Sequence, residues 1–262
     1  MRKDTAAVLN GFLYIAGGEE KNGVISPTKS LFRFDPRTGR WMIGADMHLP
    51  RQDFQIAVLN NVLYAVGGRI SPDESLSSVE RYDPATDHWE DVAELCSPRR
   101  CVAVACLNGK IYAVGGSGNK ALCSRVERYT VNDNKWELLQ SISKPRFHAH
   151  LVPINNMLYL VGGASIDIRG QLICVDAIES FSPEKNQWTC ITSMRNPRSE
   201  FGCCAINEKI YLIGGYDWNA GKRLSDVCCF NAGTKSWTSL PDLKESLIGV
   251  AASTLLVYEK HK

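Results

Sequence analysis

One stretch of the chain decides its fold: Asn60-Asn61-Val62-Leu63-Tyr64-Ala65-Val66-Gly67-Gly68. A Pro50-Arg51 dipeptide precedes this stretch, and a lone Trp89 follows its second glycine after twenty-one residues. The same order of basic residue, asparagine, apolar run, glycine pair and tryptophan recurs along the 262-residue chain. The sequence is therefore built from repeats of about fifty residues.

The glycine pairs and the tryptophans recur in step with each other. The glycine pairs lie 47 to 52 residues apart, and in every repeat an aromatic residue lies seven positions before the tryptophan. The pairs are Gly17-Gly18, Gly67-Gly68, Gly115-Gly116, Gly162-Gly163 and Gly214-Gly215. The tryptophans are Trp41, Trp89, Trp136, Trp188 and Trp237. Constant offsets repeated in this way indicate five copies of one structural unit.

Each repeat is expected to begin with a hairpin of two buried strands. In the second repeat these strands are predicted at 54–59 and 62–66, joined by a turn at Asn60-Asn61. The second strand is nearly all apolar, which is typical of a strand covered on both faces. A third strand is predicted at 79–82, and a fourth begins at Trp89.

The segment between the glycine pair and the tryptophan varies in length. Its polar stretches, such as 19–23 and 165–171, are therefore predicted to be loops. Four antiparallel strands per repeat, with a fixed inner hairpin and a variable connection after it, are typical of one blade of a β-propeller. The sequence predicts an all-β propeller with five complete four-stranded blades and a partial sixth blade.

The whole propeller is predicted to be a single domain at 1–258. Its blades are expected at approximately 1–47, 48–95, 96–142, 143–194 and 195–243, with the partial blade at 244–258 and a tail at 259–262. The partial blade is inferred from Lys244, which occupies the basic position, and from 247–258, which repeats the inner hairpin. Lys260-His261 stand where its glycines would be, so this blade is expected to be unfinished.

The recurring residues are expected to be structural. Glycine lets the backbone turn, or be approached closely, where a Cβ would clash. Each tryptophan, with the aromatic residue seven positions before it, can cover the face of a blade against its neighbour. The basic positions Arg51, Arg99, Arg146 and Arg198 keep register with these packing residues and are assigned to the same framework.

The repeat resembles the kelch repeat, whose hallmarks are a glycine pair closing the second strand and an aromatic residue seven positions before a tryptophan. The run Ser78-Val79-Glu80-Arg81-Tyr82-Asp83-Pro84 and the later Pro98-Arg99 are most similar to the propellers of the BTB-kelch (kelch-like) family. The resemblance implies that the propeller recognises substrates for a cullin-type ubiquitin ligase. It also implies six blades and upstream BTB and BACK domains, which this sequence lacks. We therefore expect a truncated product or short isoform, whose ring closes imperfectly and which reaches a cullin only through an absent BTB domain.

Composition excludes several classes of function. Thirty Lys and Arg nearly balance 28 Asp and Glu, so no field that would attract nucleic acid is expected. The apolar segments are far shorter than the roughly 20 residues of a spanning helix, and the N-terminus has no apolar segment of signal-peptide length. The sequence predicts a cytoplasmic protein without nucleic-acid or membrane partners. Its ten cysteines form no CxxC motif and are expected to be reduced and buried; the alternative is a redox-sensing thiol, for which Cys101 and Cys123 are the more exposed candidates.

The sequence shows no catalytic constellation. His148 and His150 are expected on one face of a strand, but no second cluster of ligand residues at suitable spacing accompanies them. No phosphate-binding glycine motif and no G-x-S-x-G elbow occurs. The copper chemistry of some kelch-type propellers would need a set of Tyr, His and cross-linked Cys that cannot be assembled here. The predicted protein is not an enzyme and has no cofactor and no metal site.

Two sets of variable residues are expected to meet on one face of the propeller, around the central channel, where the loops before the first strand and after the second emerge. One set follows the glycine pairs: Glu19, Arg69, Ser117, Ala164 and Tyr216. The other follows the basic positions: Gln52, Asp53, Arg100, Phe147, His148, Ser199, Glu200 and Glu245. Variation against a constant frame is what a binding surface would show; the alternative is that these residues are solvated loop ends.

Arg69, Arg100, Tyr216 and Trp218 fit a contact role best, because arginine, tyrosine and tryptophan dominate the energetics of interfaces. Two arginines at the mouth would favour an acidic peptide held by bidentate ion pairs. The predicted function is protein–protein interaction with a client protein or peptide. The alternative is a scaffold propeller associated with actin and the cytoskeleton, and an enzyme with a propeller site lacks the necessary ligands.

Overall fold

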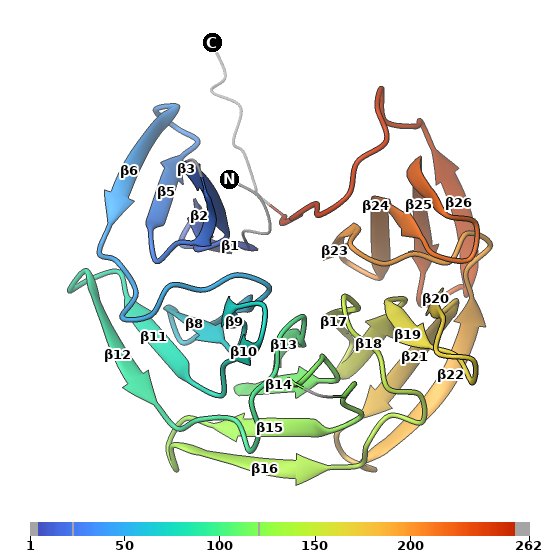
Figure 1. Ribbon diagram of the computed structural model, residues 1–262, viewed down its shortest axis with the longest axis horizontal. Coiled ribbons are helices and arrows are strands. Elements are labelled where there is room, and N and C mark those ends of the chain that lie inside the picture. The colour runs from blue at the N-terminus through green and yellow to red at the C-terminus, as the bar shows by residue number, and fades with distance from the viewer. Residues whose placement is uncertain (1–4, 23, 120, 255–262) are drawn as a thin grey trace.

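The structure, a computed structural model, describes residues 5–22, 24–119 and 121–254. Within these ranges the regular secondary structure consists of strands, joined by turns and loops, and contains no helix. It follows that none of the described segments is a helix with the length and apolar character needed to cross a membrane. Figure 1 shows the four-stranded sheets arranged around a central space. The predicted all-β propeller with five four-stranded blades is confirmed.

Each blade is an antiparallel sheet whose strands run in chain order from the channel to the outer rim (Figure 1). The innermost strands are β1 (Thr5–Leu9), β7 (Gln55–Leu59), β13 (Ala103–Leu107), β17 (His150–Ile154) and β23 (Gly202–Ile206). The second strands are β2 (Phe12–Ala16), β8 (Val62–Val66), β14 (Lys110–Val114), β18 (Met157–Val161) and β24 (Lys209–Asp217). The third strands are β5 (Leu31–Asp35), β11 (Val79–Asp83), β15 (Val126–Thr130), β21 (Ala177–Ser182) and β25 (Lys222–Asn231). The outermost strands are β6 (Arg40–Gly44), β12 (His88–Val92), β16 (Lys135–Leu139), β22 (Gln187–Ser193) and β26 (Ser236–Leu240). We number the blades one to five in this order.

The inner hairpins form where the turn residues allow them. In blade two, β7 and β8 pair in a register that ends at Leu59 opposite Val62. The turn between them places both Asn60 and Asn61 at positive φ, which asparagine tolerates better than most residues. The outermost strand of this blade begins at His88, one residue before the tryptophan that was expected to start it.

The prediction of loops at 19–23 and 165–171 is wrong in part, because both stretches contribute strands to two-stranded ribbons. These ribbons pair β3 (Glu19–Asn22) with β4 (Val24–Pro27), β9 (Arg69–Ser71) with β10 (Glu74–Ser75), and β19 (Ala164–Ile166) with β20 (Leu172–Cys174). Their strands have only two to four residues each, which is too short for an alternation of apolar and polar residues to show. The sequence pattern therefore gave no sign of these strands.

The apolar core lies between neighbouring blades. Trp89 packs against Tyr14 and Leu31 of the preceding blade, and its indole Nε1 donates a 2.8 Å hydrogen bond to the carbonyl oxygen of Ala45. The same indole-to-carbonyl bond recurs in blades three and four. Trp41 is instead 53% exposed, because its cover would come from a preceding blade and the described residues place none there.

The glycine pairs lie where neighbouring blades come closest. Gly67 has a φ of +63°, and a Cβ on it would lie 2.5 Å from the carbonyl oxygen of Arg99 in the next blade. The amide of Gly68 donates a 2.8 Å hydrogen bond to that same oxygen. The guanidinium of Arg99 is buried and donates to the carbonyl of Gly115 and to the carboxylate of Glu127. The recurring arginines are thus part of the framework that joins the blades.

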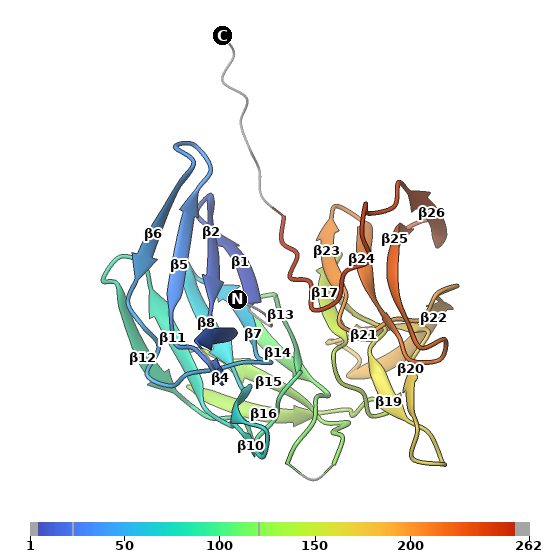
Figure 2. The same cartoon turned by 45° about the horizontal axis from the view of Figure 1, so that its top comes forward.

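The start of the predicted sixth blade lies three residues later than expected. Leu247, rather than Lys244, occupies the position of the buried arginines, since its carbonyl oxygen accepts a 2.8 Å hydrogen bond from Gly215. Residues 247–254 form no strand and run between β23 and β1 (Figures 1 and 2). A hairpin strand needs its partner, and the partner predicted here lies outside the described residues, as do Lys260-His261 and the tail at 259–262.

Candidate binding surface at the channel mouth

The two variable sets meet in blades two to five. The residue after the basic position and the residue after the glycine pair form an isolated antiparallel bridge in blades two to five. These mouth pairs are Gln52 with Arg69, Arg100 with Ser117, Phe147 with Ala164, and Ser199 with Tyr216. In the first of them the two amides and carbonyls exchange hydrogen bonds of 3.1 and 2.9 Å. Backbone pairing therefore fixes the Cα positions of these variable residues.

A second ring of residues lies one position further along the chain and lines a cavity of about 210 Å³. This channel ring consists of Asp53, Cys101, His148, Glu200 and Gly249, all with φ between 52° and 64°. The amide of Cys101 donates to the carbonyl of Asp53 at 2.6 Å, and the amide of His148 to the carbonyl of Cys101 at 3.1 Å. Gly249 donates to Glu200 in the same way at 2.9 Å. Backbone hydrogen bonds between channel-ring residues thus join these blades directly.

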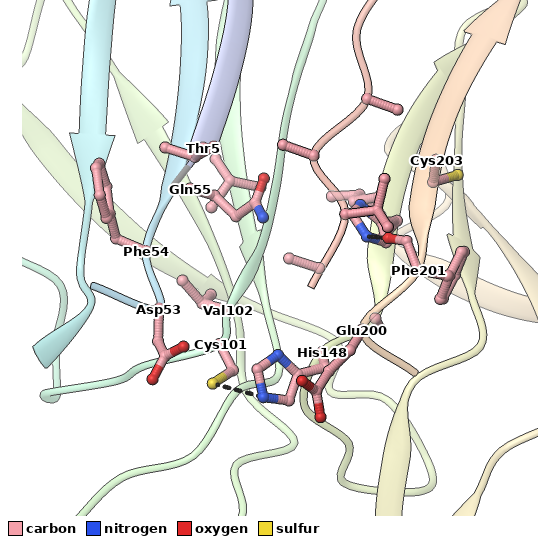
Figure 3. Close-up of a pocket in the computed structure, with 18 of the residues that line it drawn as sticks. Thr5, Asp53, Phe54, Gln55, Cys101, Val102, His148, Glu200, Phe201 and Cys203 are labelled. Atoms are coloured by element: carbon pink, nitrogen blue, oxygen red, sulfur yellow. Dashed lines mark hydrogen bonds between the residues drawn. The ribbon is translucent and has the colours of Figure 1, made fainter. Parts of the chain in front are cut away.

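Three side chains of the channel ring converge. The Sγ of Cys101 lies 3.3 Å from the Nε2 of His148, and an oxygen of Asp53 lies within 4.8 Å of both ligand atoms. Figure 3 shows these side chains at one end of the cavity, with Glu200 beside His148 and with Thr5 and Cys203 toward the other end. The sequence offered no ligand residues to accompany His148, and the structure differs because it brings together positions from three blades.

His150 is separated from this group, although the sequence suggested one shared strand face. It begins β17, and its Nε2 lies 2.7 Å from the carbonyl oxygen of Phe201. Loss of solvation lowers the pKa of His150 to about 4, so the neutral ring donates its N–H to that carbonyl. His150 is thus held by the backbone of Phe201, whereas His148 precedes the strand and belongs to the channel ring.

The predicted aromatic contacts form one cluster on blade five. The rings of Tyr216 and Trp218 lie edge to face with their centroids 4.7 Å apart. The indole Nε1 of Trp218 donates a 3.0 Å hydrogen bond to the Oγ of Ser199, which is fully buried. Both aromatic side chains are half-buried, so they present apolar surface in a fixed orientation at the mouth. That is the arrangement expected of an interface anchor.

The two predicted arginines differ in their surroundings. The Nε of Arg69 forms a 2.6 Å ion pair with Asp53, whose side chain is 4% exposed, so the charge of Arg69 is already balanced. Arg100 donates to the carbonyl of Pro72 at 2.8 Å and to the Oγ of Ser75 at 3.4 Å, both uncharged groups. Arg100 is therefore better suited than Arg69 to receive a carboxylate from a partner.

The remaining predicted contact residues differ in burial. Gln52, Asp53 and Ser199 are buried, whereas Ser117, Phe147, His148 and Glu200 are half-buried. Which of them touch a partner stays a prediction. Cys101 was absent from the predicted site. It lies two residues after a basic residue, as do the predicted contacts Asp53, His148 and Glu200 in their own repeats. Comparing equivalent positions across the repeats, rather than spacings along the chain, would have found it.

The comparisons with known proteins agree with this geometry. Residues 3–215 match the family model described as the KLHDC2/KLHL20/DRC7 Kelch-repeats domain, and residues 197–244 match the Kelch motif. The chain belongs to the kelch-repeat family. This kelch propeller is 53% identical to mouse Kelch-like protein 13 over 254 residues, and the aligned region covers 96% of this chain and 39% of the relative. It is 52% identical over 255 residues to human Kelch-like protein 31, covering 95% of the chain and 40% of the relative.

The kelch propeller spans about two fifths of the length of these curated relatives. Its fold is also similar to a solved structure titled "Structure of YjhT", with a TM-score of 0.80 over 92% of this chain and 84% of that chain. Sequence identity to that structure is 18%, so the likeness concerns the fold alone. Similarity to the kelch-like proteins therefore agrees with the propeller fold and with the kelch family.

Proposed function

We propose that this kelch propeller recognises a client protein for a cullin-type ubiquitin ligase, as the client-binding part of a BTB-kelch adaptor. One observation carries the proposal: a constant frame positions residues that differ from blade to blade around a single channel mouth. Buried arginines and close glycine contacts make the frame rigid. A rigid frame lowers the entropic cost of ordering the contact residues when a partner binds.

The surface suggests what the client offers. Tyr216 and Trp218 supply half-buried aromatic surface, which favours an apolar side chain of the client at blade five. Arg100, two blades away, favours a carboxylate. A short client segment with an apolar residue and an acidic residue would meet both requirements. Arg69 contributes less to this preference, because a client carboxylate would compete with Asp53 for it.

A capture experiment with matched variants tests the proposal. The tagged chain is expressed in cells, and bound proteins are quantified for the wild type, for a Tyr216→Ala/Trp218→Ala double variant and for Arg100→Ala. Leu138→Ala is the control, because Leu138 is 60% exposed on β16 at the outer rim. We expect a client that both the wild type and Leu138→Ala capture, and that the double variant captures at least tenfold less.

The ligase role requires a second measurement on the same client. Its cellular abundance should rise when cullin activation is blocked, and also when the chain is overexpressed as a competitor of the full-length adaptor. Capture of actin with no cullin-dependent client, unaffected by the mouth variants, would instead favour the cytoskeletal scaffold and would overturn the proposal.

A further inference from the structure

The channel ring combines three side chains that are each common metal ligands. We propose that Asp53, Cys101 and His148 bind one divalent transition-metal ion at the channel mouth, and that Zn²⁺ fits these ligands best. The proposal concerns the residues that close the channel and does not depend on the identity of a client. It rests on the geometry, the chemistry of the ligand set and the rigidity of the backbone that carries it.

The distances suit a shared ion. Zinc lies about 2.3 Å from a cysteine sulfur and about 2.0–2.1 Å from a histidine nitrogen, so a tetrahedral site places those two atoms about 3.5 Å apart. Cys101 Sγ and His148 Nε2 are 3.3 Å apart. The ligand oxygen of Asp53 is within 4.8 Å of each of these atoms, so only a small shift of the carboxylate is needed for all three atoms to reach one ion.

The ligand set selects the kind of ion. A thiolate and an imidazole are soft and borderline ligands, which favour zinc and neighbouring transition metals over Mg²⁺ or Ca²⁺. Three protein ligands leave a fourth position for water or another group, the arrangement of open rather than closed zinc sites. Glu200 lines the same cavity and lies beside His148 (Figure 3), so it adds a carboxylate close to the ligands.

The surrounding residues hold the ligands in place. Arg69 pairs with Asp53 at 2.6 Å and orients the carboxylate, and a carboxylate has enough lone pairs to keep this partner while it binds a cation. The positive charge of Arg69 opposes an incoming cation. The negative charges of Asp53 and Glu200 together outweigh it, so the cavity as a whole attracts a divalent ion.

The backbone supports the site independently of any ion. The three ligands come from blades two, three and four, and direct hydrogen bonds between their main chains fix their spacing. All three have positive φ, a conformation that costs energy for residues other than glycine and that recurs at functional sites. A bound ion would link three blades, and because it binds the folded chain it would raise the melting temperature.

A metal titration of the full chain tests the proposal. The protein is purified with a chelator, dialysed and titrated with Co²⁺, whose bond to a thiolate produces a charge-transfer absorption band. Zn²⁺ is then added as a competitor. We expect one Co²⁺ per chain with a thiolate band that Zn²⁺ abolishes, and a melting temperature that Zn²⁺ raises by a few degrees. Absence of the thiolate band would overturn the proposal.

Variants locate the ion. Cys101→Ser and His148→Asn each remove one ligand, and asparagine tolerates the positive φ at this position. Each should weaken binding at least about 100-fold, since even substitutions behind the ligands cost about 10–100-fold. The controls are Cys123→Ser, a half-buried thiol elsewhere, and His48→Asn, from a second His/acid group with Glu80 and Asp91. Equal affinity in the ring variants and the wild type would refute the site.

A measurement on the wild-type chain keeps the test sound if a variant fails to fold. Alkylation of each cysteine is followed by mass spectrometry with and without Zn²⁺. The ion should slow alkylation of Cys101 at least tenfold and leave Cys123 unchanged, since both thiols are half-buried but only Cys101 lies in the ring. Equal slowing of both thiols, or of neither, would contradict binding at the channel ring.

Discussion

Replacing Glu127 with glutamine should remove a large part of the stability of the propeller. Glu127 is fully buried, with one oxygen accepting from Arg99 and the other accepting a 2.8 Å hydrogen bond from the amide of Cys96. Glutamine keeps the shape of the side chain but removes its charge, which leaves the cation of Arg99 buried and uncompensated. Breaking a buried ion pair in this way costs about 3–5 kcal/mol in free energy of unfolding.

A matched pair in blade five sets the control. Arg198 and Asp226 occupy the equivalent positions, but the carboxylate of Asp226 is 26% exposed, against 0% for Glu127. Water already screens the partly exposed carboxylate of Asp226, so its ion pair with Arg198 contributes less, and Asp226→Asn should cost roughly half as much. The difference between the two losses in free energy of unfolding measures what burial of the carboxylate contributes, because both variants replace a carboxylate that pairs with a buried arginine by the corresponding amide.

The assay is urea unfolding followed by tryptophan fluorescence and circular dichroism, with the free energy of unfolding taken from the midpoint and slope. Arg99→Met, and its combination with Glu127→Gln, complete a double-mutant cycle. The double variant should lose less than the sum of the single variants by at least about 2 kcal/mol, because the two residues are in direct contact. Additive losses, or a loss below about 1 kcal/mol for Glu127→Gln, would refute the reasoning.

Two further predictions concern residues whose environments differ between repeats. Trp89→Ala should lower the free energy of unfolding by about 3–5 kcal/mol, whereas Trp41→Ala should lower it by less than half as much, because Trp89 is 1% exposed and Trp41 is 53% exposed. Equal losses in urea unfolding would contradict the packing of Trp89 between blades. Burial raises the pKa of the Cys106 thiol to about 12, so its alkylation in the native protein at pH 8 should be at least about 100-fold slower than that of the exposed Cys190. Mass spectrometry of the alkylated protein would show this difference, which should vanish in urea; a native Cys106 that reacts as fast as Cys190 would disprove it.

Much of the fold was predictable because it is encoded locally and repeated. The inner hairpin of blade two was expected at 54–59 and 62–66, and it occurs at Gln55–Leu59 and Val62–Val66. Apolar runs and asparagine turns act over a few residues, so the sequence displays them directly. The ribbons at the mouth escaped prediction because strands of two to four residues are too short to show a periodic pattern.

The register of the last segment needed the structure. Lys244 looked like the next basic position, yet the hydrogen bond from Gly215 identifies Leu247 as the equivalent residue. Side-chain type was the signal in the sequence, whereas in the structure this position is defined by a carbonyl oxygen that meets a glycine of the neighbouring blade. A backbone contact of this kind does not depend on the side chain, so no residue pattern revealed it.

Local patterns in the sequence were enough to predict five four-stranded blades and the framework of glycines, arginines and tryptophans. Which of the variable residues meet depends on how the blades pack. Asp53, Cys101 and His148 are about fifty residues apart from one to the next, and closing the blades around the channel brings their ligand atoms within 4.8 Å. Local sequence patterns encode the strands and turns of each blade, whereas the contacts between blades form only when the blades pack around the channel.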